Sequence, residues 1–210
     1  MSWTRWILCP ARRFSALLFV LFAVPGAAIA ATTLENMQTA FNGESSAHLR
    51  YLAFSHRADK EGYGAVASLF RAAARAEEIH AANHAEVIKE MGAVPQAHIE
   101  TLTVRSTREN LEAAIKGESY ERDSMYPEFL KQARMDRNRR AIVSLNYART
   151  AESEHAKLFA AALRDLNGLK GTNHTTFYYV CPTCGYTVLA TDFEKCPSCF
   201  TAKGFFEVIS

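Results

Sequence analysis

The chain has 210 residues, 49% of them hydrophobic and 22% charged, and its formal net charge is +2. This composition excludes a disordered chain, and the length allows one well-buried core with a small appendage. Without the three arginines of residues 1–30, 21 Lys and Arg stand against 22 Asp and Glu. With no basic stripe in the remainder, the sequence argues against nucleic acid as a partner.

Residues 1–30 have the pattern of an export signal. Three arginines precede an apolar run at residues 16–24, and an A-x-A motif at residues 28–30 fits a cleavage site. The paired arginines at residues 12–13 resemble a twin-arginine signal, although the residues after them depart from that pattern. We expect an exported, periplasmic protein. An uncleaved membrane anchor is the alternative, although the apolar run is shorter than the roughly 20 residues that span a bilayer.

Two long helices are expected next, at residues 34–61 and 65–91. Both segments are rich in Ala, Leu, Glu and Arg, and both are followed by glycine. A polar connection at residues 98–105 is long enough to run from one end of a bundle to the other. Ser106 and Glu109 then form a capping box, which predicts the start of a third helix.

The second half of the helical region is expected to add two more segments. Pro127 lies within the third helix and predicts a kink, because proline has no backbone donor. This helix should end near residues 136–138, and a fourth should cover residues 139–166. Short, long and short connections between four helices are typical of a ferritin-like four-helix bundle with one long crossover. We therefore predict a mainly α bundle domain at residues 31–168.

A smaller domain follows the bundle. Residues 169–175 have the Gly, Asn and Thr content of a linker. Short aromatic and β-branched runs at residues 177–180 and 205–209 predict small strands on either side of four cysteines. We predict a small β/knuckle metal-binding domain at residues 176–210.

Two short motifs, Glu-x-x-His and Gly-Glu-Ser, each occur twice with similar spacing. Residues three apart on a helix share one face, so the motifs can face one another inside a bundle. Together with Glu121, which lies three residues after the second Gly-Glu-Ser glutamate, they offer five carboxylates and two imidazoles as metal-binding and catalytic residues: Glu44, Glu77, His80, Glu118, Glu121, Glu152 and His155. This is the di-iron or di-manganese pattern of ferritin-like bundles, in which metal charge offsets buried carboxylates. Alternatively, these side chains are solvated, and the repeat records an old duplication of a helical hairpin.

Four more side chains lie at helical spacing from these ligands. Tyr51 follows the first ligand Glu by two turns, and Tyr126 follows the last Glu of the third helix by five residues. Both are candidates to donate hydrogen bonds to ligand carboxylates, with ordinary core tyrosines as the alternative. His48 and His84 have no counterpart in the other half, so we interpret them as lying beside the ligands or on the surface.

The cysteines form two C-x2-C motifs with eleven residues between them: Cys181 and Cys184, then Cys196 and Cys199. Two such knuckles place four thiolates tetrahedrally around zinc or a single iron. Structural zinc is the commoner occupant, whereas iron can pass single electrons. Gly185 permits a turn with φ > 0 after the first knuckle. Phe200, at the matching place in the second knuckle, is expected to lack that freedom.

The combination resembles rubrerythrin, a ferritin-like di-iron bundle followed by a rubredoxin-like module with one iron on four cysteines. The resemblance rests on these sequence motifs: A-F-N-G-E-S, A-E-E-I-H-A, G-E-S-Y-E-R-D-S-M-Y-P, A-E-S-E-H-A and the four cysteines. The resemblance implies a peroxidase that reduces hydrogen peroxide and is re-reduced through the cysteine-bound iron. It also implies a homodimer with one subunit's module near the other's bundle, and a redox-linked shift of one iron between His80 and Glu121.

Two other functions stay open at this point. One is a ferroxidase that oxidises ferrous iron for storage or detoxification, and the other is a non-catalytic metal-binding electron carrier with zinc in its module. The electron donor of a peroxidase would be a rubredoxin-like or cytochrome-like protein or a reductase. Rubrerythrins are mostly cytoplasmic, so a working export signal would exclude direct reduction by a cytoplasmic NADH-linked reductase.

Overall fold

The computed structural model describes residue 1, residues 31–171 and residues 176–210. The predicted export signal, apart from its first residue, and part of the predicted linker lie outside the described residues. Residues 31–210 form one compact unit. Within the described part of the chain, no helix combines the length and apolar character that a membrane span requires.

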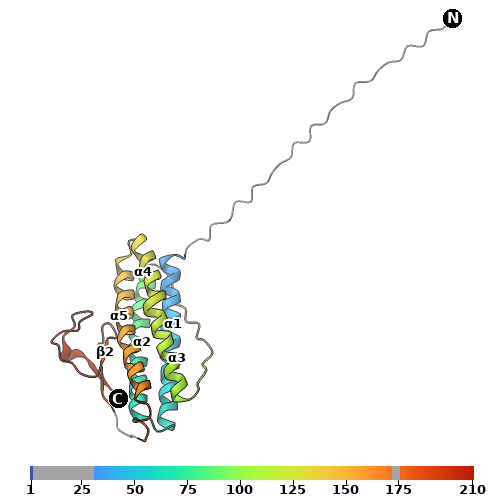
Figure 1. Ribbon diagram of the computed structural model, residues 1–210. Coiled ribbons are helices and arrows are strands. Elements are labelled where there is room, and N and C mark those ends of the chain that lie inside the picture. Colours follow the sequence, from blue (N-terminus) through green and yellow to red (C-terminus); the bar gives the residue numbers. More distant parts are fainter. Residues whose placement is uncertain (2–30, 172–175) are drawn as a thin grey trace. The chain divides into compact units, whose positions relative to one another are not determined.

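Four helical rods form the bundle (Figure 1). The first two are α1 (Thr33–Lys60) and α2 (Gly64–Glu90), and the last is α5 (Arg139–Arg164). The third rod consists of α3 (Thr107–Tyr120), a π-helical turn η1 (Glu121–Met125) and α4 (Tyr126–Met135). The capping box predicted for the third rod is present, with the side chains and backbones of Ser106 and Glu109 bonded reciprocally.

A π-helical turn lies immediately before Pro127, where the sequence predicts a kink. The N–H of Tyr126 bonds to the carbonyl of Glu121, five residues back. Pro127 has no N–H to bond the carbonyl four residues back, so widening the turn ahead of it loses no bond at that position. The widened turn begins at Glu121, one of the candidate ligands.

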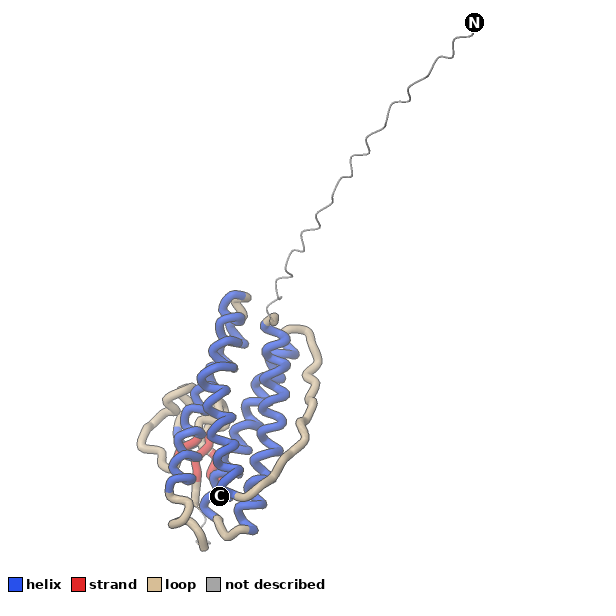
Figure 2. Tube along the Cα trace, turned by 45° about the vertical axis from the view of Figure 1, so that its right-hand side comes forward, coloured by secondary structure: helices blue, strands red, loops and turns tan. Residues whose placement is uncertain are grey.

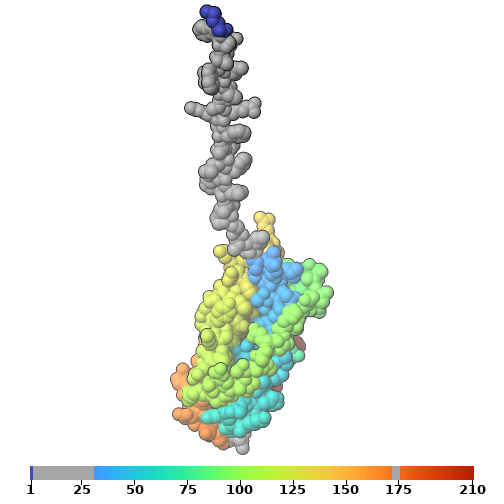
Figure 3. All heavy atoms as spheres, turned by 90° about the vertical axis from the view of Figure 1, so that its right-hand side faces the viewer, coloured from blue at the N-terminus to red at the C-terminus, as the bar shows by residue number. Residues whose placement is uncertain are grey.

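The crossover between α2 and α3 runs along the bundle (Figure 2) and shares a face with α1 and α3 (Figure 3). Three α1 side chains, each four residues apart, bond the backbone of every second crossover residue: Gln38 to Gln96, Asn42 to His98 and Ser46 to Glu100. Four helical residues rise about 6 Å and two extended residues about 6.6 Å, so the row of α1 side chains stays in register with the backbone groups of the crossover. The crossover is therefore pinned to α1.

Two apolar clusters fill the bundle on either side of its middle. Phe54, Phe70 and Phe159 belong to one of them, with ring centroids 5.1 and 5.4 Å apart for the two pairs that involve Phe70. Met37 and Leu145 belong to the other. The candidate metal ligands lie along the helices between these clusters.

Two glycines, Gly43 and Gly117, lie inside α1 and α3. Glycine within a helix costs about 1 kcal/mol of stability relative to alanine. An added Cβ would meet no atom within 4 Å at either position. Alanine would therefore fit at both, and packing does not explain why glycine is present.

The C-terminal module is a three-stranded antiparallel sheet in the order β2-β1-β3, with a 3-10 turn η2. Its elements are β1 (Tyr178–Val180), β2 (Thr187–Val188), η2 (Lys203–Phe205) and β3 (Glu207–Ile209). The module packs against the chain's own bundle: Arg75 on α2 contacts both carboxylate oxygens of Glu207, at 2.6 and 2.8 Å. The homodimer implied by the resemblance stays a prediction.

Candidate metal centres

Six of the seven predicted carboxylate and histidine ligands come together in the middle of the bundle, and none is more than 1% exposed. Their donor atoms form two overlapping groups within 4.8 Å: Glu44, Glu77, His80 and Glu152, and Glu77, Glu118, Glu152 and His155. Glu77 and Glu152 belong to both groups. These two carboxylates are therefore placed to bridge a pair of metal ions.

Each histidine directs Nδ1 into this cluster. His80 Nδ1 lies 2.8 Å from Glu77 Oε2, and His155 Nδ1 lies 3.0 Å from Glu152 Oε2. Both imidazoles come from the Glu-x-x-His motifs of α2 and α5, whose i, i+3 spacing puts acid and ring on one helix face. The Nδ1 atoms are thus the ring nitrogens available to metal.

The opposite ring nitrogens contact the C-terminal module. His80 Nε2 donates to the carbonyl of Cys184 at 3.1 Å, and His155 Nε2 lies 3.1 Å from Thr187 Oγ1. Thr187 Oγ1 itself donates to the carbonyl of Gly185, so it accepts from His155. Both rings therefore carry a proton on Nε2, and Nδ1 is the nitrogen that a metal ion would bind in place of its carboxylate contact.

The cluster holds more negative charge than a protein interior tolerates without cations. Burial, and next the charge on Glu77, raises the pKa of Glu44 and Glu152 well above the ordinary value. One carboxylate oxygen each of Glu44, Glu118 and Glu152 is buried without a hydrogen bond. Two divalent cations would offset the charge and engage these oxygens, so the donor set fits a di-iron centre.

A tyrosine from each half of the bundle donates to a ligand carboxylate, as the sequence suggested. Tyr51 bonds Glu118, and Tyr126 bonds Glu44. Burial, followed by the charge of the bonded carboxylate, raises the pKa of both tyrosines well above the ordinary value. Both hydroxyls therefore stay protonated and hold the ligand oxygens in place.

His84 extends this network, and Ser144 was not found from the sequence. Ser144 Oγ lies 2.7 Å from His84 Nδ1, and His84 Nε2 lies 3.2 Å from the Tyr126 hydroxyl. Burial is the main cause that lowers the pKa of His84 to about 3, so the ring is neutral and accepts at Nδ1 while donating from Nε2. His48 instead is half-buried and bonds the carbonyl of Ala74, outside the cluster.

Glu121, the seventh predicted ligand, belongs to neither group of donors. It is half-buried and lines a cavity of about 430 Å³ beside the crossover. Burial, followed by the charges of Glu118 and Glu77, raises its pKa well above the ordinary value, while Arg50 opposes the rise. Its carboxylate therefore lies within electrostatic reach of the cluster, on the side that faces the cavity.

The four cysteines come together as two facing knuckles. The Sγ atoms of Cys181 and Cys199 are 3.4 Å apart, and those of Cys184 and Cys196 are 3.5 Å apart. All four are free thiols, and three of them are buried. Four sulfurs at this spacing fit one tetrahedrally coordinated metal ion.

Both knuckles close with the same backbone bond, in which Gly185 N donates to Cys181 O and Phe200 N to Cys196 O, each at 2.9 Å. Gly185 has a φ of 72°, as its lack of a side chain allows. Phe200 has a φ of 64°, so the expectation that it cannot follow this turn is wrong. The left-handed conformation costs a residue other than glycine about 1–2 kcal/mol, and the Phe200 side chain is 74% exposed.

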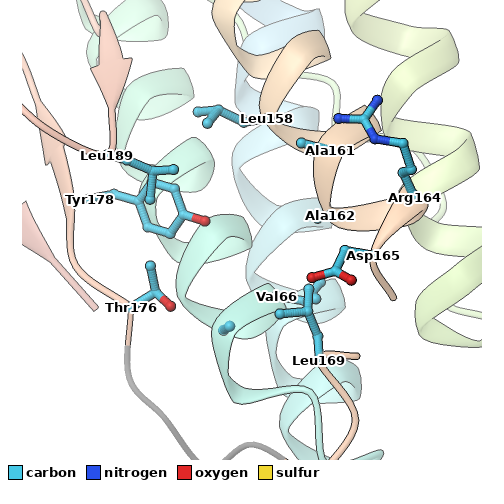
Figure 4. Close-up of a pocket in the computed structure, with 11 residues that line it drawn as sticks. Val66, Leu158, Ala161, Ala162, Arg164, Asp165, Leu169, Thr176, Tyr178 and Leu189 are labelled. Carbon is cyan, nitrogen blue, oxygen red and sulfur yellow. The ribbon is translucent and has the colours of Figure 1, made fainter. Parts of the chain in front are cut away.

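A second cavity, of about 380 Å³, opens between the bundle and the module (Figure 4). Tyr178 and Leu189 line it from the module, and Val66, Leu158 and Asp165 line it from α2, α5 and the turn after α5. None of the candidate metal ligands lines this cavity. It therefore gives no access to either cluster.

Known proteins share this arrangement. The family model named Rubrerythrin matches residues 35–163. Nigerythrin of Nitratidesulfovibrio vulgaris is 36% identical over 176 residues, which cover 83% of this chain and 85% of the relative. Rubrerythrin-2 of Clostridium acetobutylicum is 37% identical over 179 residues, which cover 84% of this chain and 96% of the relative.

Solved structures agree with these matches. Nigerythrin in a mixed-valence state and in a fully reduced, all-ferrous state superposes with a TM-score of 0.77 at 35% identity, covering 92% of this chain and 94% of that chain. A bacterioferritin of Desulfovibrio desulfuricans covers 68% of this chain and 90% of its own at a TM-score of 0.63, and its 21% identity shows likeness of fold alone. The predicted ferritin-like bundle, the rubredoxin-like module and the two kinds of iron site are confirmed.

Proposed function

This chain belongs to the rubrerythrin family, and on that premise we propose that it is a non-haem di-iron peroxidase that reduces hydrogen peroxide to water. The reaction combines one H₂O₂ with two protons and two electrons to give two molecules of water. When bound, the bundle irons would supply the two electrons that break the O–O bond, and the four-cysteine iron would return them one at a time.

One contact carries the proposal: the hydrogen bond of 3.1 Å from His80 Nε2 to the carbonyl of Cys184. His80 belongs to the buried carboxylate cluster, and Cys184 belongs to the first knuckle, so a short path of covalent and hydrogen bonds joins the two sites. An electron relay needs such a path. A purely structural zinc would make no use of it, because zinc does not change its oxidation state.

The chain's own residues prepare the bundle site. His80 and His155 direct Nδ1 toward the carboxylates of the site, and their opposite nitrogens bond the module. Tyr51 and Tyr126 hold carboxylate ligands by donating from protonated hydroxyls. Apolar clusters on both sides limit the entry of water. These hydrogen bonds orient the ligand side chains toward the site.

Stoichiometric reduction and reoxidation of the iron-loaded full chain test the proposal. The visible absorption of the four-cysteine iron should bleach under an anaerobic reductant and return on addition of hydrogen peroxide. Glu77→Ala should abolish the return, because this carboxylate belongs to both donor groups. Ser198→Ala, beside a cysteine ligand but not itself a ligand, is the matched control.

The same assay separates the other two functions. A ferroxidase would consume peroxide only while ferrous iron is added, whereas a peroxidase turns over with reductant alone. If the chain is a non-catalytic carrier, Glu121→Ala should leave its rate of peroxide consumption unchanged. Unchanged peroxide consumption by Glu77→Ala would refute the peroxidase.

We further propose that the chain acts after export, as residues 1–30 indicate. Its electron donor would then be a rubredoxin-like or cytochrome-like protein of the same compartment. Protease added to cells with a permeabilised outer layer should digest the chain. Full protection, with a cytoplasmic marker protein protected to the same extent, would contradict export.

A further inference from the structure

The cavity beside Glu121 lies between α1, the crossover and the third rod, on the face shown in Figure 3. Its volume of about 430 Å³ far exceeds the roughly 10–15 Å³ that one water needs, and it falls within the range of small-molecule sites. Its wall is polar at Asn42, Arg50 and His98 and apolar at Met125 and Phe129. Of the seven candidate ligands, only Glu121 lines it.

The roof of the cavity is held in a fixed position. His98 and Glu100 of the crossover line it, and their backbone N–H groups donate to Asn42 Oδ1 at 3.1 Å and Ser46 Oγ at 3.2 Å. Arg50 continues the same row of α1 side chains and lies 3.7 Å from the Glu100 carboxylate. The crossover therefore cannot collapse into the cavity without breaking several of these bonds.

The floor of the cavity carries the two helix glycines. Gly43 and Gly117 both line it, and each directly precedes a ligand, Glu44 or Glu118. A Cβ at either position would project into open space. Each glycine lowers helix stability, and the two occupy equivalent places in the two halves of the chain. Alanine would fit at both places but would narrow the cavity. Stabilising replacements such as Gly→Ala can cost activity where the replaced residue serves the site, and the position of both glycines on the cavity wall gives them such a role.

We propose that this cavity admits and holds the oxidant beside Glu121, and that Gly43 and Gly117 keep it wide enough for small alkyl hydroperoxides as well as hydrogen peroxide. The inference rests on the proposed peroxidase function and adds its substrate class. The reaction would be ROOH with two protons and two electrons giving ROH and water. The O–O bond breaks, the electrons come from the iron centre and ultimately from the donor protein, and the protons come from solvent.

A hydroperoxide suits this wall because it has two different ends. The O–O–H end can bond to carboxylate and guanidinium groups, which Glu121 and Arg50 supply. The alkyl end can contact Met125 and Phe129. The other six ligands are buried and do not line this cavity, so Glu121 is the candidate ligand that a molecule in the cavity would meet.

Narrowing the cavity tests the proposal. In the iron-loaded full chain, Gly117→Val should lower kcat/KM for tert-butyl hydroperoxide about tenfold or more, and that for hydrogen peroxide by a clearly smaller factor. Gly43→Ala and Gly117→Ala should also lower kcat/KM for tert-butyl hydroperoxide more than kcat/KM for hydrogen peroxide. Each should raise Tm by about 2–4 °C. Thr150→Ala, exposed on α5 and away from the cavity, should leave both kcat/KM values unchanged.

Binding without turnover gives a second readout. In zinc-loaded chain, tert-butyl alcohol should shift the amide resonances of Tyr120 and Met125, and Gly117→Val should abolish the shifts. If the wild type reduces neither peroxide but binds the alcohol there, the peroxidase fails and the cavity assignment stands. The cavity assignment is overturned if the shifts appear elsewhere or if Gly117→Val leaves the ratio of the two kcat/KM values unchanged. Reduction of hydrogen peroxide alone by the wild type would overturn the substrate class.

Discussion

Replacing Gly185 by alanine should disrupt the hydrogen bond between His80 and the Cys184 carbonyl, which joins the two metal sites. Gly185 has a φ of 72°, and a Cβ there would lie 2.3 Å from His80 Nε2. The left-handed backbone costs alanine about 1–2 kcal/mol. Loss of the hydrogen bond from His80 to the Cys184 carbonyl adds about 1 kcal/mol. The sum of about 2–3 kcal/mol corresponds to a Tm lower by about 4–12 °C for a chain of this size.

The same substitution should weaken the bundle site. Because the ring of His80 must move away from the new methyl group, the bundle's affinity for iron should fall about 10- to 100-fold, as for other losses of a bond that orients a ligand. Thermal unfolding followed by circular dichroism gives the Tm. Titration with a competing chelator gives the affinity.

Two further glycines separate the causes. Gly92 has a φ of 80° and no atom within 4 Å of an added Cβ, so Gly92→Ala carries the backbone cost alone. Gly204 lies in η2 of the same module as Gly185, without a positive φ and with no atom within 4 Å of an added Cβ. Gly204→Ala therefore carries neither the backbone cost nor a clash. If Gly185→Ala lowers Tm and iron affinity no more than Gly92→Ala does, the close approach to His80 has no energetic role and the reasoning is refuted.

Three other substitutions have expected outcomes. Tyr126→Phe removes the donor to Glu44 and should lower iron affinity about 10- to 100-fold in the chelator titration. Phe200→Gly relieves a left-handed backbone at an exposed site and should raise Tm by about 2–8 °C without loss of four-cysteine iron. Arg75→Ala removes the paired bonds to Glu207; since both side chains are one-third exposed, stability should fall by at most about 1 kcal/mol. Its clearer effect is faster hydrogen exchange in β3, measured by mass spectrometry.

Each of these substitutions has a matched control. Tyr63→Phe changes a half-buried tyrosine outside the ligand cluster and should leave iron affinity unchanged. Phe205→Gly, also exposed but without a positive φ, should not raise Tm. Arg140→Ala breaks an exposed ion pair with Glu90 on the surface of the bundle and should not affect exchange in β3. Equal effects in a variant and its control would contradict the corresponding argument.

The repeated motifs carried most of what the sequence could reveal. Glu-x-x-His on helices of known period places acid and ring on one face, and a bundle leaves few ways to arrange two such faces. The bonds of His80 and His155 to residues 184 and 187 could not be predicted in the same way. They join segments about 100 and 30 residues apart, and they depend on how the module packs on the bundle.

Local rules also failed where several effects compete. Pro127 predicted that the third rod is not a regular α-helix, but it did not predict the π-helical turn. Several backbone geometries can accommodate a residue without an N–H, and the sequence does not select among them. Phe200 shows that a conformational preference of about 1–2 kcal/mol yields to the geometry of the surrounding knuckle. Ser144 bonds His84 across two helices, at a sequence separation that no periodicity relates.

His80 and His155 both bond the segment 184–187, which contains a cysteine ligand, so we expect the two metal sites to be thermodynamically linked. An ion on the cysteines would restrain this segment, and the restrained segment would hold both imidazoles for the bundle ions. Whatever factor the first ion adds to the affinity for the second, the second must add to the affinity for the first, since binding free energies are reciprocal. As iron becomes scarce, partly loaded chains should be rarer than independent sites would give, and the population should divide into full and empty forms.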